Sequence, residues 1–407
     1  MAPTGFQDRP EKKSYDVVIV GGAIMGCSAA WWLTEMPDFD GSILVVERDG
    51  SYAQASTTLT NSCIRQQFSS EINIRISQFT AEFIGSLKAR MDGRDWAPDL
   101  KVRNFGYLYL AADERFAASL RAAQKMQAAA GAGTRLMTPD DIAAAFPFYD
   151  LDGIVLGSFN DKDEGYWDGS TVFECWRRSA RERGVEFVSG EVVAMTRDAS
   201  GTRVESVALA SGETIGCGQV VNASGPRAAR TAAMAGLDLP VEPRKRYTWV
   251  IRAERPLDRD LPLTIDPSGA HVRELGGGTY LCGGHADVDP AADYDDFAMD
   301  GSLWEDKIWP ALATRIPAFE AVKVEQEWAG HYAYNTFDHN AVIGPHPELR
   351  NFVFLNGFSG HGLQQSPAMG RGAAELLTYG AFRSLDLSEF GYDRILRDEP
   401  VLETAII

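Results

Sequence analysis

The sequence predicts two interleaved domains, a doubly wound α/β domain and an α+β domain with an antiparallel sheet. Three observations support this prediction. A strand, a glycine turn, a helix and a second strand follow one another over residues 16–47, the length of a βαβ unit. Two more strands of the parallel type, at 218–225 and 351–357, come much later in the chain. Alternating strand-like segments lie between them, so the two domains interleave rather than follow one another.

Hydrophobic periodicity places the other elements in order. Helical spacing predicts helices at 27–35, 71–91, 112–130, 139–147, 172–184, 301–320 and 367–379. Alternation and apolar runs predict strands at 16–20, 42–47, 101–110, 185–188, 191–198, 204–210, 247–253, 271–275 and 279–284. Residues 50–70 are small and hydroxyl-rich, which is typical of a loop, and this loop is long enough to be functional.

These segments set the expected domain boundaries. The N-terminus, residues 1–14, is polar and lacks the apolar core of a signal peptide, so we expect it to be disordered. We expect a dinucleotide-binding domain to comprise residues 15–98, 160–238 and 336–407, and a substrate-binding domain to comprise residues 99–159 and 239–335.

Composition disfavours several classes of protein. The 407 residues carry 39 basic and 57 acidic side chains, and the net charge of −18 repels nucleic acid and anionic membranes. No apolar run reaches transmembrane length. The five cysteines are scattered, which fits neither a disulfide framework nor a zinc site and favours a cytoplasmic location. The six histidines lack metal-binding spacing, so we expect no metal.

The first glycine turn predicts a dinucleotide site. Residues 21–26 read GGAIMG, a G-x-G-x-x-G pattern in which Ala23 replaces the middle glycine. The glycines allow a sharp turn that brings helix amides up to a pyrophosphate. Glu47, at the end of the second strand, would accept both hydroxyls of an adenine ribose and repel a 2′-phosphate, which disfavours NADP. The plain alternative is a tight βα turn of another α/β fold.

A second glycine cluster follows the last strand. Residues 355–370 contain four glycines and lead into a helix. Such a turn brings backbone amides and a helix N-terminus up to a flat or anionic group, although an elaborate helix start would look the same. Separately, Arg65 lies at the end of the 50–70 loop, where a guanidinium could clamp a carboxylate. Arg65, Arg273 and the basic cluster 243–247 each have a plain alternative as solvated surface charges.

These motifs resemble those of the FAD-dependent D-amino-acid oxidase superfamily, in its branch of glycine oxidase, monomeric sarcosine oxidase and dimethylglycine dehydrogenase. The similarity spans the chain from Tyr15, and its carriers are VVIVGGAIMG with VVER, the AST-T-LTN loop, VVNASG, HYAYNTFDHNAVIGPHP and GFSGHGLQQSPAMGRGAAELL. The motifs PRKRY, YNTFD, IGPHP and GFSGHGLQQ are most similar to a group that includes a mitochondrial complex I assembly protein. The resemblance implies a Rossmann-type FAD-binding domain of the glutathione-reductase-like kind, interleaved with an antiparallel-sheet substrate domain.

The resemblance also implies which residues hold FAD. The first glycine turn and the following carboxylate would hold the pyrophosphate and adenosine: Gly21, Gly22, Ala23, Ile24, Met25, Gly26 and Glu47. Arg48 and the backbone of Val192 would lie beside the adenine. The residues lining the phosphates and flavin would be Ser56, Thr57, Asn61, Ala223, Ser224 and Gly225. The pyrimidine edge of the flavin, where a helix start stabilises negative charge, would face Gly357, Phe358, Ser359, Gly360, His361, Gly362, Leu363 and Gln364.

The implied reaction is the oxidation of a secondary or tertiary amino acid. A neutral amine delivers hydride to flavin N5, and water hydrolyses the resulting imine. Sarcosine oxidases hold the substrate carboxylate with a lysine where this chain has Gln364. The carboxylate would therefore depend on Arg65, with Lys245, Arg273 or His331 as further candidates.

This sequence also differs from its relatives at two sets of positions that would lie near the flavin. The lysine that activates oxygen in sarcosine oxidases is replaced by Leu281 or Cys282, which puts fast reaction with oxygen in doubt. The positions that link flavin covalently in relatives correspond to His331 and Leu59. We therefore expect FAD to be bound non-covalently, with a link to His331 left open.

Three hypotheses about function follow. The first is FAD-dependent oxidation of the C–N bond of an N-substituted amino acid, such as iminodiacetate, sarcosine or an opine-like compound, with O2 or another electron acceptor. The second is an FAD-binding assembly or chaperone factor with little turnover, which the missing lysines favour. The third is an NAD-dependent dehydrogenase, which the second glycine cluster disfavours.

Overall fold

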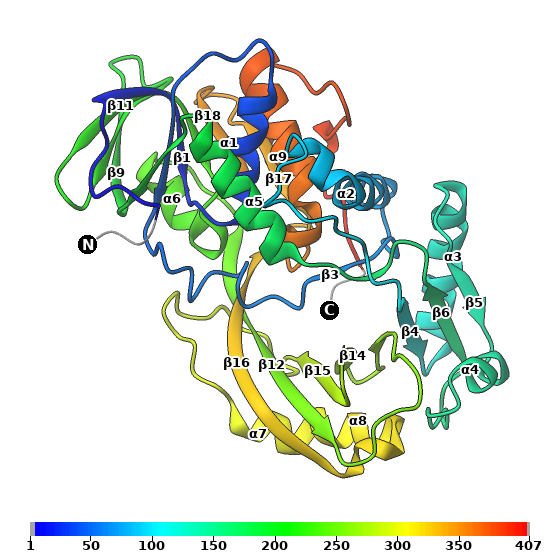
Figure 1. Cartoon of the computed structure of the whole chain (residues 1–407). Helices are drawn as coiled ribbons and strands as arrows, with labels where there is room; N and C mark the ends of the chain where they lie inside the picture. The colour runs from blue at the N-terminus through cyan, green and yellow to red at the C-terminus, as the bar shows by residue number, and fades with distance from the viewer. Residues whose placement is uncertain (1–4, 405–407) are drawn as a thin grey trace.

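The computed structural model describes residues 5–404, which form two large sheets with helices packed around them (Figure 1). The strands of the first sheet are β1 (Ser14–Val20), β2 (Ile43–Glu47), β8 (Glu186–Ser189), β9 (Val192–Arg197), β10 (Val204–Leu209), β11 (Thr214–Asn222), β17 (Val342–Pro345) and β18 (Phe352–Asn356). Those of the second are β4 (Tyr107–Ala111), β5 (Arg135–Met137), β6 (Leu156–Asn160), β12 (Val241–Ala253), β13 (Leu263–Ile265), β14 (His271–Gly276), β15 (Thr279–Gly284) and β16 (Val322–Asn335). Two short strands, β3 (Cys63–Ile64) and β7 (Gly165–Tyr166), pair with each other.

The helices are α1 (Ile24–Glu35), α2 (Glu71–Arg90), α3 (Glu114–Ala129), α4 (Pro139–Ala145), α5 (Gly169–Glu182), α6 (Ala228–Met234), α7 (Gly301–Leu303), α8 (Trp309–Arg315), α9 (Gly362–Tyr379) and α10 (Asp393–Leu396). Short 3₁₀ turns occur at Gly225–Arg227, Pro317–Glu320 and Ser388–Phe390. The helix expected at 301–320 is broken, because a π turn at Trp304–Ile308 separates α7 from α8.

The first sheet confirms the predicted doubly wound α/β fold. Its path runs β17-β18-β11-β1-β2-β8, and the pairs from β18 to β8 are parallel. β18 comes from near the C-terminus, yet it pairs with β11, which in turn pairs with β1. The sheet therefore assembles three distant stretches of the chain, as interleaved domains require.

Both faces of this sheet are covered, which explains the apolar runs of β1 and β2. On one face, α1, α5 and α9 lie side by side (Figure 1), over a core that contains Trp31, Phe83 and Trp176. On the other face, apolar side chains of β9, β10 and α6 form a second core. Helices α1 and α9 approach so closely that a Cβ at Gly370 would lie 2.0 Å from Ser28 Oγ, which explains why the residue there is glycine.

The second sheet is built on two long strands. β12 and β16 pair antiparallel over 13 residues, and in Figure 1 they run from the first domain down to α7 and α8. β15 and β14 continue the sheet in antiparallel fashion, and β13 pairs in parallel with β4. The strands come from residues 107–160 and 241–335, on either side of the stretch that supplies α5 and α6 to the first domain.

Residues 5–14 differ from the expected disorder, while the prediction for residues 1–4 lies outside the described residues. Phe6 is buried against Tyr52 and Phe187. The amide of Gln7 donates to the carbonyl of Phe187 at 2.8 Å, beside the edge strand β8. One aromatic side chain and an open strand edge hold this segment, and neither produces a periodic pattern in the sequence.

Helix α9 begins at Gly362 rather than at Pro367, where the sequence analysis placed its start. A proline inside a helix has no N–H for the carbonyl four residues earlier. That carbonyl, of Leu363, accepts a hydrogen bond from Ser366 Oγ at 2.8 Å instead. The helix therefore starts within the glycine cluster, and its N-terminal amides lie at the cluster itself.

Candidate active site

An extended cavity lies between the two domains, at the carboxyl ends of β1 and β2 and the N-termini of α1 and α9. The expected cofactor residues that line it are Gly21, Ala23, Ile24, Met25, Glu47, Arg48, Ser56, Thr57, Asn61, Val192, Ala223, Ser224, Gly225, Phe358, Ser359, Gly360, His361, Gly362, Leu363 and Gln364. Gly22, Gly26 and Gly357 do not line it and shape the backbone behind the wall.

The first glycine turn has no room for side chains. Gly21 has a φ of +100°, and a Cβ there would lie 2.5 Å from the carbonyl oxygen of Ala223. A Cβ at Gly26 would lie 1.9 Å from the carbonyl oxygen of Gly21. The N-cap residue of α1, Ala23, makes no capping hydrogen bond, and the amide of Ile24 donates to Thr57 Oγ1 at 3.2 Å. The turn thus presents a helix start without an N-cap side chain to the cavity, as suits a pyrophosphate site.

Glu47 lies at the end of β2 and is largely buried. Its carboxylate accepts hydrogen bonds from the amides of Gly22 at 2.8 Å and Asp49 at 2.9 Å. Burial raises the pKa of Glu47, and the two amides oppose that shift. A carboxylate held in this way keeps free lone pairs toward the cavity, which suits the hydroxyls of a ribose.

The second glycine cluster forms a tight loop before α9. Gly360 has a φ of +91°, and a Cβ there would lie 2.4 Å from the ring of Tyr332. Ser359 also has a positive φ, 46°, and its amide donates to the carbonyl of Ala333 at 2.9 Å. No side chain caps α9, whose N-cap residue is His361. The loop therefore brings a second helix start of this kind to the same cavity.

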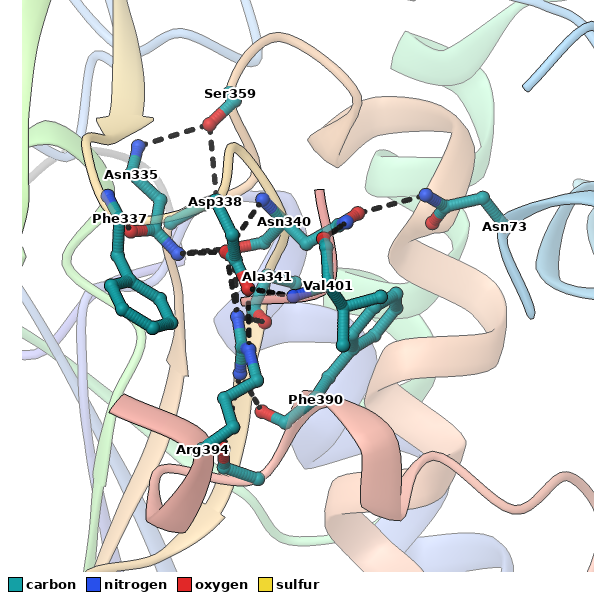
Figure 2. Close-up of polar contacts among 12 residues, drawn as sticks. Asn73, Asn335, Phe337, Asp338, Asn340, Ala341, Ser359, Phe390, Arg394 and Val401 are labelled. Atoms are coloured by element: carbon teal, nitrogen blue, oxygen red, sulfur yellow. Dashed lines mark hydrogen bonds and ion pairs between the residues drawn. The ribbon is translucent and has the colours of Figure 1, made fainter. Parts of the chain in front are cut away.

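A buried polar network fixes this loop from behind (Figure 2). Ser359 Oγ accepts from the amide of Asn335 at 2.9 Å, and Asn335 Nδ2 donates to Asp338 at 3.0 Å. Arg394 Nε donates to the same carboxylate at 2.7 Å, and both side chains of this ion pair are almost entirely buried. Residues from the C-terminal segment thus hold the loop that faces the cavity.

Arg65 lines the cavity with only 2% of its surface exposed. Its guanidinium donates to the carbonyl of Gln67, lies 2.9 Å from His361 Nε2 and stacks over the ring of Phe68 at 4.0 Å. Because arginine only donates, His361 Nε2 is the acceptor in this contact. The cation is thus rigidly placed in the wall near the start of α9.

Gln364 lies in the first turn of α9 and is buried. Its side-chain oxygen accepts from the backbone amide of Arg65 at 2.9 Å, and its carbonyl accepts from Thr80 Oγ1 at 2.6 Å. The residue that replaces the lysine of sarcosine oxidases therefore positions the Arg65 backbone.

The structure does not bring Lys245 or Arg273 to the cavity. Lys245 pairs with Asp296 at 2.6 Å, and Arg273 stacks over the ring of Tyr166 at 4.9 Å. Arg246, next to Lys245 on β12, does line the cavity. Both terminal nitrogens of Arg246 donate to Asp289 at 3.0 Å.

His271 is a lining residue that sequence reasoning missed. It begins β14, and its Nε2 lies 2.9 Å from the side-chain nitrogen of Asn61. Burial lowers the pKa of His271 to about 4, and nearby cations add to the effect, so the ring is neutral at pH 7. His271 and Arg273 are two residues apart on one strand and so share a face, which could have made His271 a candidate as well. In the structure, only the start of β14 reaches the cavity.

Of the other residues predicted from the sequence, His331 lines the cavity, whereas Leu281 and Cys282 do not. His331 lines the cavity from β16, with its Nε2 2.9 Å from the carbonyl of Asp296. Leu281 and Cys282 are buried in β15 and do not line it. Tyr107 and Tyr332, near Arg65, also line the cavity, and burial raises the pKa values of both phenols.

Among residues 5–404, no three His, Cys, Asp or Glu side chains are grouped so as to hold a metal ion. No helix in the same range is both long and apolar enough to cross a membrane.

Fold and site together define a flavin-dependent oxidoreductase, because a ribose carboxylate and two helix starts without a side-chain N-cap converge on one cavity between a Rossmann-type domain and a substrate domain. The family model described as "FAD dependent oxidoreductase" (DAO) matches residues 16–376, and the chain belongs to this family. Its cofactor is FAD, and the lining residues fit that group.

Relatives agree with this assignment. The chain is 38% identical to FAD-dependent oxidoreductase domain-containing protein 1 of Xenopus laevis, over all of this chain and 87% of that protein. It is 26% identical to sarcosine oxidase subunit beta of Rhizobium meliloti, over 93% of this chain and 88% of that one. The solved structure of L-proline dehydrogenase from P. horikoshii matches with a TM-score of 0.82 and 26% identity, over 95% of this chain and 99% of that one.

Proposed function

We propose that this protein oxidises the C–N bond of an amino acid whose nitrogen carries a second substituent, such as sarcosine, iminodiacetate or an opine-like compound. The observation that carries the proposal is the pair of buried arginines in the cavity wall, Arg65 and Arg246, whose charges both lie near Tyr332. Guanidinium groups bind carboxylates in two-point fashion. The similarity to proteins named for sarcosine and L-proline supports the proposal, since both compounds are secondary amines with a carboxylate.

The two arginines would have different roles. Arg65 is placed to hold the carboxylate next to the reacting carbon, since it lies beside the start of α9. Arg246 is already paired with Asp289, so a second carboxylate of the substrate would bind there by competing with that side chain. A substrate with two carboxylates would use both cations, which makes iminodiacetate a suitable probe.

The remaining lining residues would keep the amine reactive. FAD supplies the two-electron acceptor that takes hydride from the carbon next to nitrogen. His271 is neutral at pH 7, so it adds no positive charge that would repel an amine. Tyr107, Tyr332 and Leu263 line this end of the cavity and exclude water from the reacting atoms.

The test is anaerobic reduction of the bound flavin, followed as loss of its yellow absorbance. The panel contains sarcosine, iminodiacetate, L-proline and dimethylamine, a secondary amine without a carboxylate. We expect the amino acids to bleach the flavin and dimethylamine to leave it oxidised. Arg65→Met should weaken binding of the amino acids by about 1.5–3 kcal/mol, the scale of a hydrogen bond to a charged group. The matched control is Arg252→Met, since Arg252 lies on the same strand as Arg246 but pairs with Glu325 at the surface.

Two results would contradict the proposal. Bleaching by none of the amino acids would favour the second hypothesis, a protein that binds FAD with little turnover, which the placement of Gln364, Leu281 and Cys282 supports. Equal bleaching by dimethylamine would show that the site does not require a carboxylate, and unchanged affinity in Arg65→Met would show that Arg65 does not bind one.

A further inference from the structure

The segment 285–300 joins β15 to α7 without forming a helix or an extended strand, and two of its residues line the cavity; we call it the strap. It contains six aspartates and no lysine or arginine. An isolated bridge between Ala291 and Arg244 and a hydrogen bond from the amide of Ala292 to the carbonyl of Pro243 attach its backbone to β12. Most of the other contacts that hold it come from side chains.

The middle of the strap forms part of the cavity wall. Tyr294 and Phe297 both line the cavity. Phe297 stacks on His331, with ring centroids 4.3 Å apart. Tyr294 lies against the guanidinium groups of Arg227 and Arg230, at 5.3 and 5.2 Å from its ring centroid. Two aromatic rings from the substrate domain therefore reach the cavity beside residues of the FAD-binding domain.

Ion pairs attach the strap to both domains. Asp295 pairs with Arg227 and, at 3.5 Å, with Arg48, and both arginines line the cavity on the FAD-binding domain. Asp296 pairs with Lys245 of β12 at 2.6 Å. The aspartate side chains are 63% and 46% exposed, so salt screens these pairs.

We infer that the strap is a further part of the cofactor site: Tyr294 and Phe297 close the cavity over bound FAD, and the ion pairs of Asp295 and Asp296 keep the strap closed. The cavity runs beneath the strap from Glu47 and Arg48 to the start of α9. FAD that occupies this length leaves only when the strap moves away from Arg48 and Arg227. The rate of FAD release therefore depends on ionic strength and on the two aspartates.

The test measures FAD release from the holoprotein by the rise in FAD fluorescence after dilution, at low and high NaCl. We expect the double variant Asp295→Asn/Asp296→Asn to release FAD about 3- to 30-fold faster than wild type at low salt, because it removes three partly exposed ion pairs that hold the strap. Wild type should release FAD faster at high NaCl than at low NaCl, and the double variant should lose most of this difference. Lys245→Met, which removes one of these pairs from the opposite side, should give a smaller effect of the same sign.

The matched control is Asp260→Asn, which removes an exposed ion pair to Arg103 away from the strap and should leave release unchanged. Thermal melting of each variant shows whether the fold is intact. Wild-type release rates in the double variant, or an equal change in Asp260→Asn, would overturn the inference. This readout is cofactor binding, so it is independent of whether the proposed substrates are oxidised.

Discussion

Replacing Asp338 by Asn tests the buried network behind the glycine loop that precedes α9 (Figure 2). The Asp338 carboxylate accepts from Arg394 at 2.7 and 3.0 Å, from the amides of Asn340 and Val401 at 3.1 Å each, and from Asn335 at 3.0 Å. Asp338 is 0% and Arg394 3% exposed. The variant leaves the guanidinium buried without its counter-ion, a change that costs about 3–5 kcal/mol in other proteins.

This magnitude translates into a large shift of the melting temperature. One kcal/mol moves the midpoint by about 2–4 °C for a domain of 150–250 residues, so we expect the melting temperature to fall by about 6–20 °C. Circular dichroism or calorimetry of the FAD-loaded protein measures it. Removing the cation as well, in Asp338→Asn/Arg394→Met, should recover part of the loss, because no unpaired charge then remains buried.

The control is Glu325→Gln, which breaks an exposed pair with Arg252 and should leave the melting temperature unchanged. A shift below about 2 °C in Asp338→Asn, or a double variant less stable than both single variants, would refute the reasoning that the buried charge pair dominates this network.

Four more outcomes follow from the structure. Acid precipitation should release all of the FAD into the supernatant, since we expect no covalent bond to His331; flavin that stays with the pellet would refute this. After substrate reduction, admission of air should restore the yellow colour slowly, because no lysine stands at the Leu281 or Cys282 positions; reoxidation at the rate of an efficient oxidase would contradict it. Gly360→Ala should weaken FAD binding at least about tenfold, since its Cβ meets Tyr332, whereas Gly85→Ala in open space on α2 should not. Burial raises the pKa of Glu164 to about 7 from 4.5, so the native protein holds a proton that the unfolded chain releases; stability should fall as pH rises from about 4.5 to 7, and melting curves of Glu164→Gln should lack this decline.

Much of the cofactor site could be predicted from the sequence, because its determinants are local. The GGAIMG turn and Glu47 lie on one βαβ unit, in which chain geometry alone brings the turn and the end of β2 to the same edge. The cluster before α9 needs positive φ angles at Gly357 and Gly360, which glycine adopts readily. Such requirements act over a few residues and leave a readable pattern.

The part of the cavity wall that carries Arg65 and Arg246 could not be predicted to the same extent. Nothing in the local sequence distinguishes the basic residues Arg65, Lys245, Arg246 and Arg273, yet of these four only Arg65 and Arg246 line the cavity. The difference depends on where each side chain lies once the strands have paired, and these pairings join residues distant in the chain.

The sequence by itself thus predicted a dinucleotide site, the interleaved fold and the two glycine turns, because local backbone geometry and hydrophobic periodicity are written in neighbouring residues. Only the tertiary structure decided which cations line the cavity, how the Ser366 hydroxyl bonds the carbonyl that Pro367 leaves without a partner, and that residues of the strap line the cavity. These features depend on contacts between segments far apart in the chain, and their energies come from burial and charge pairing that no local pattern records.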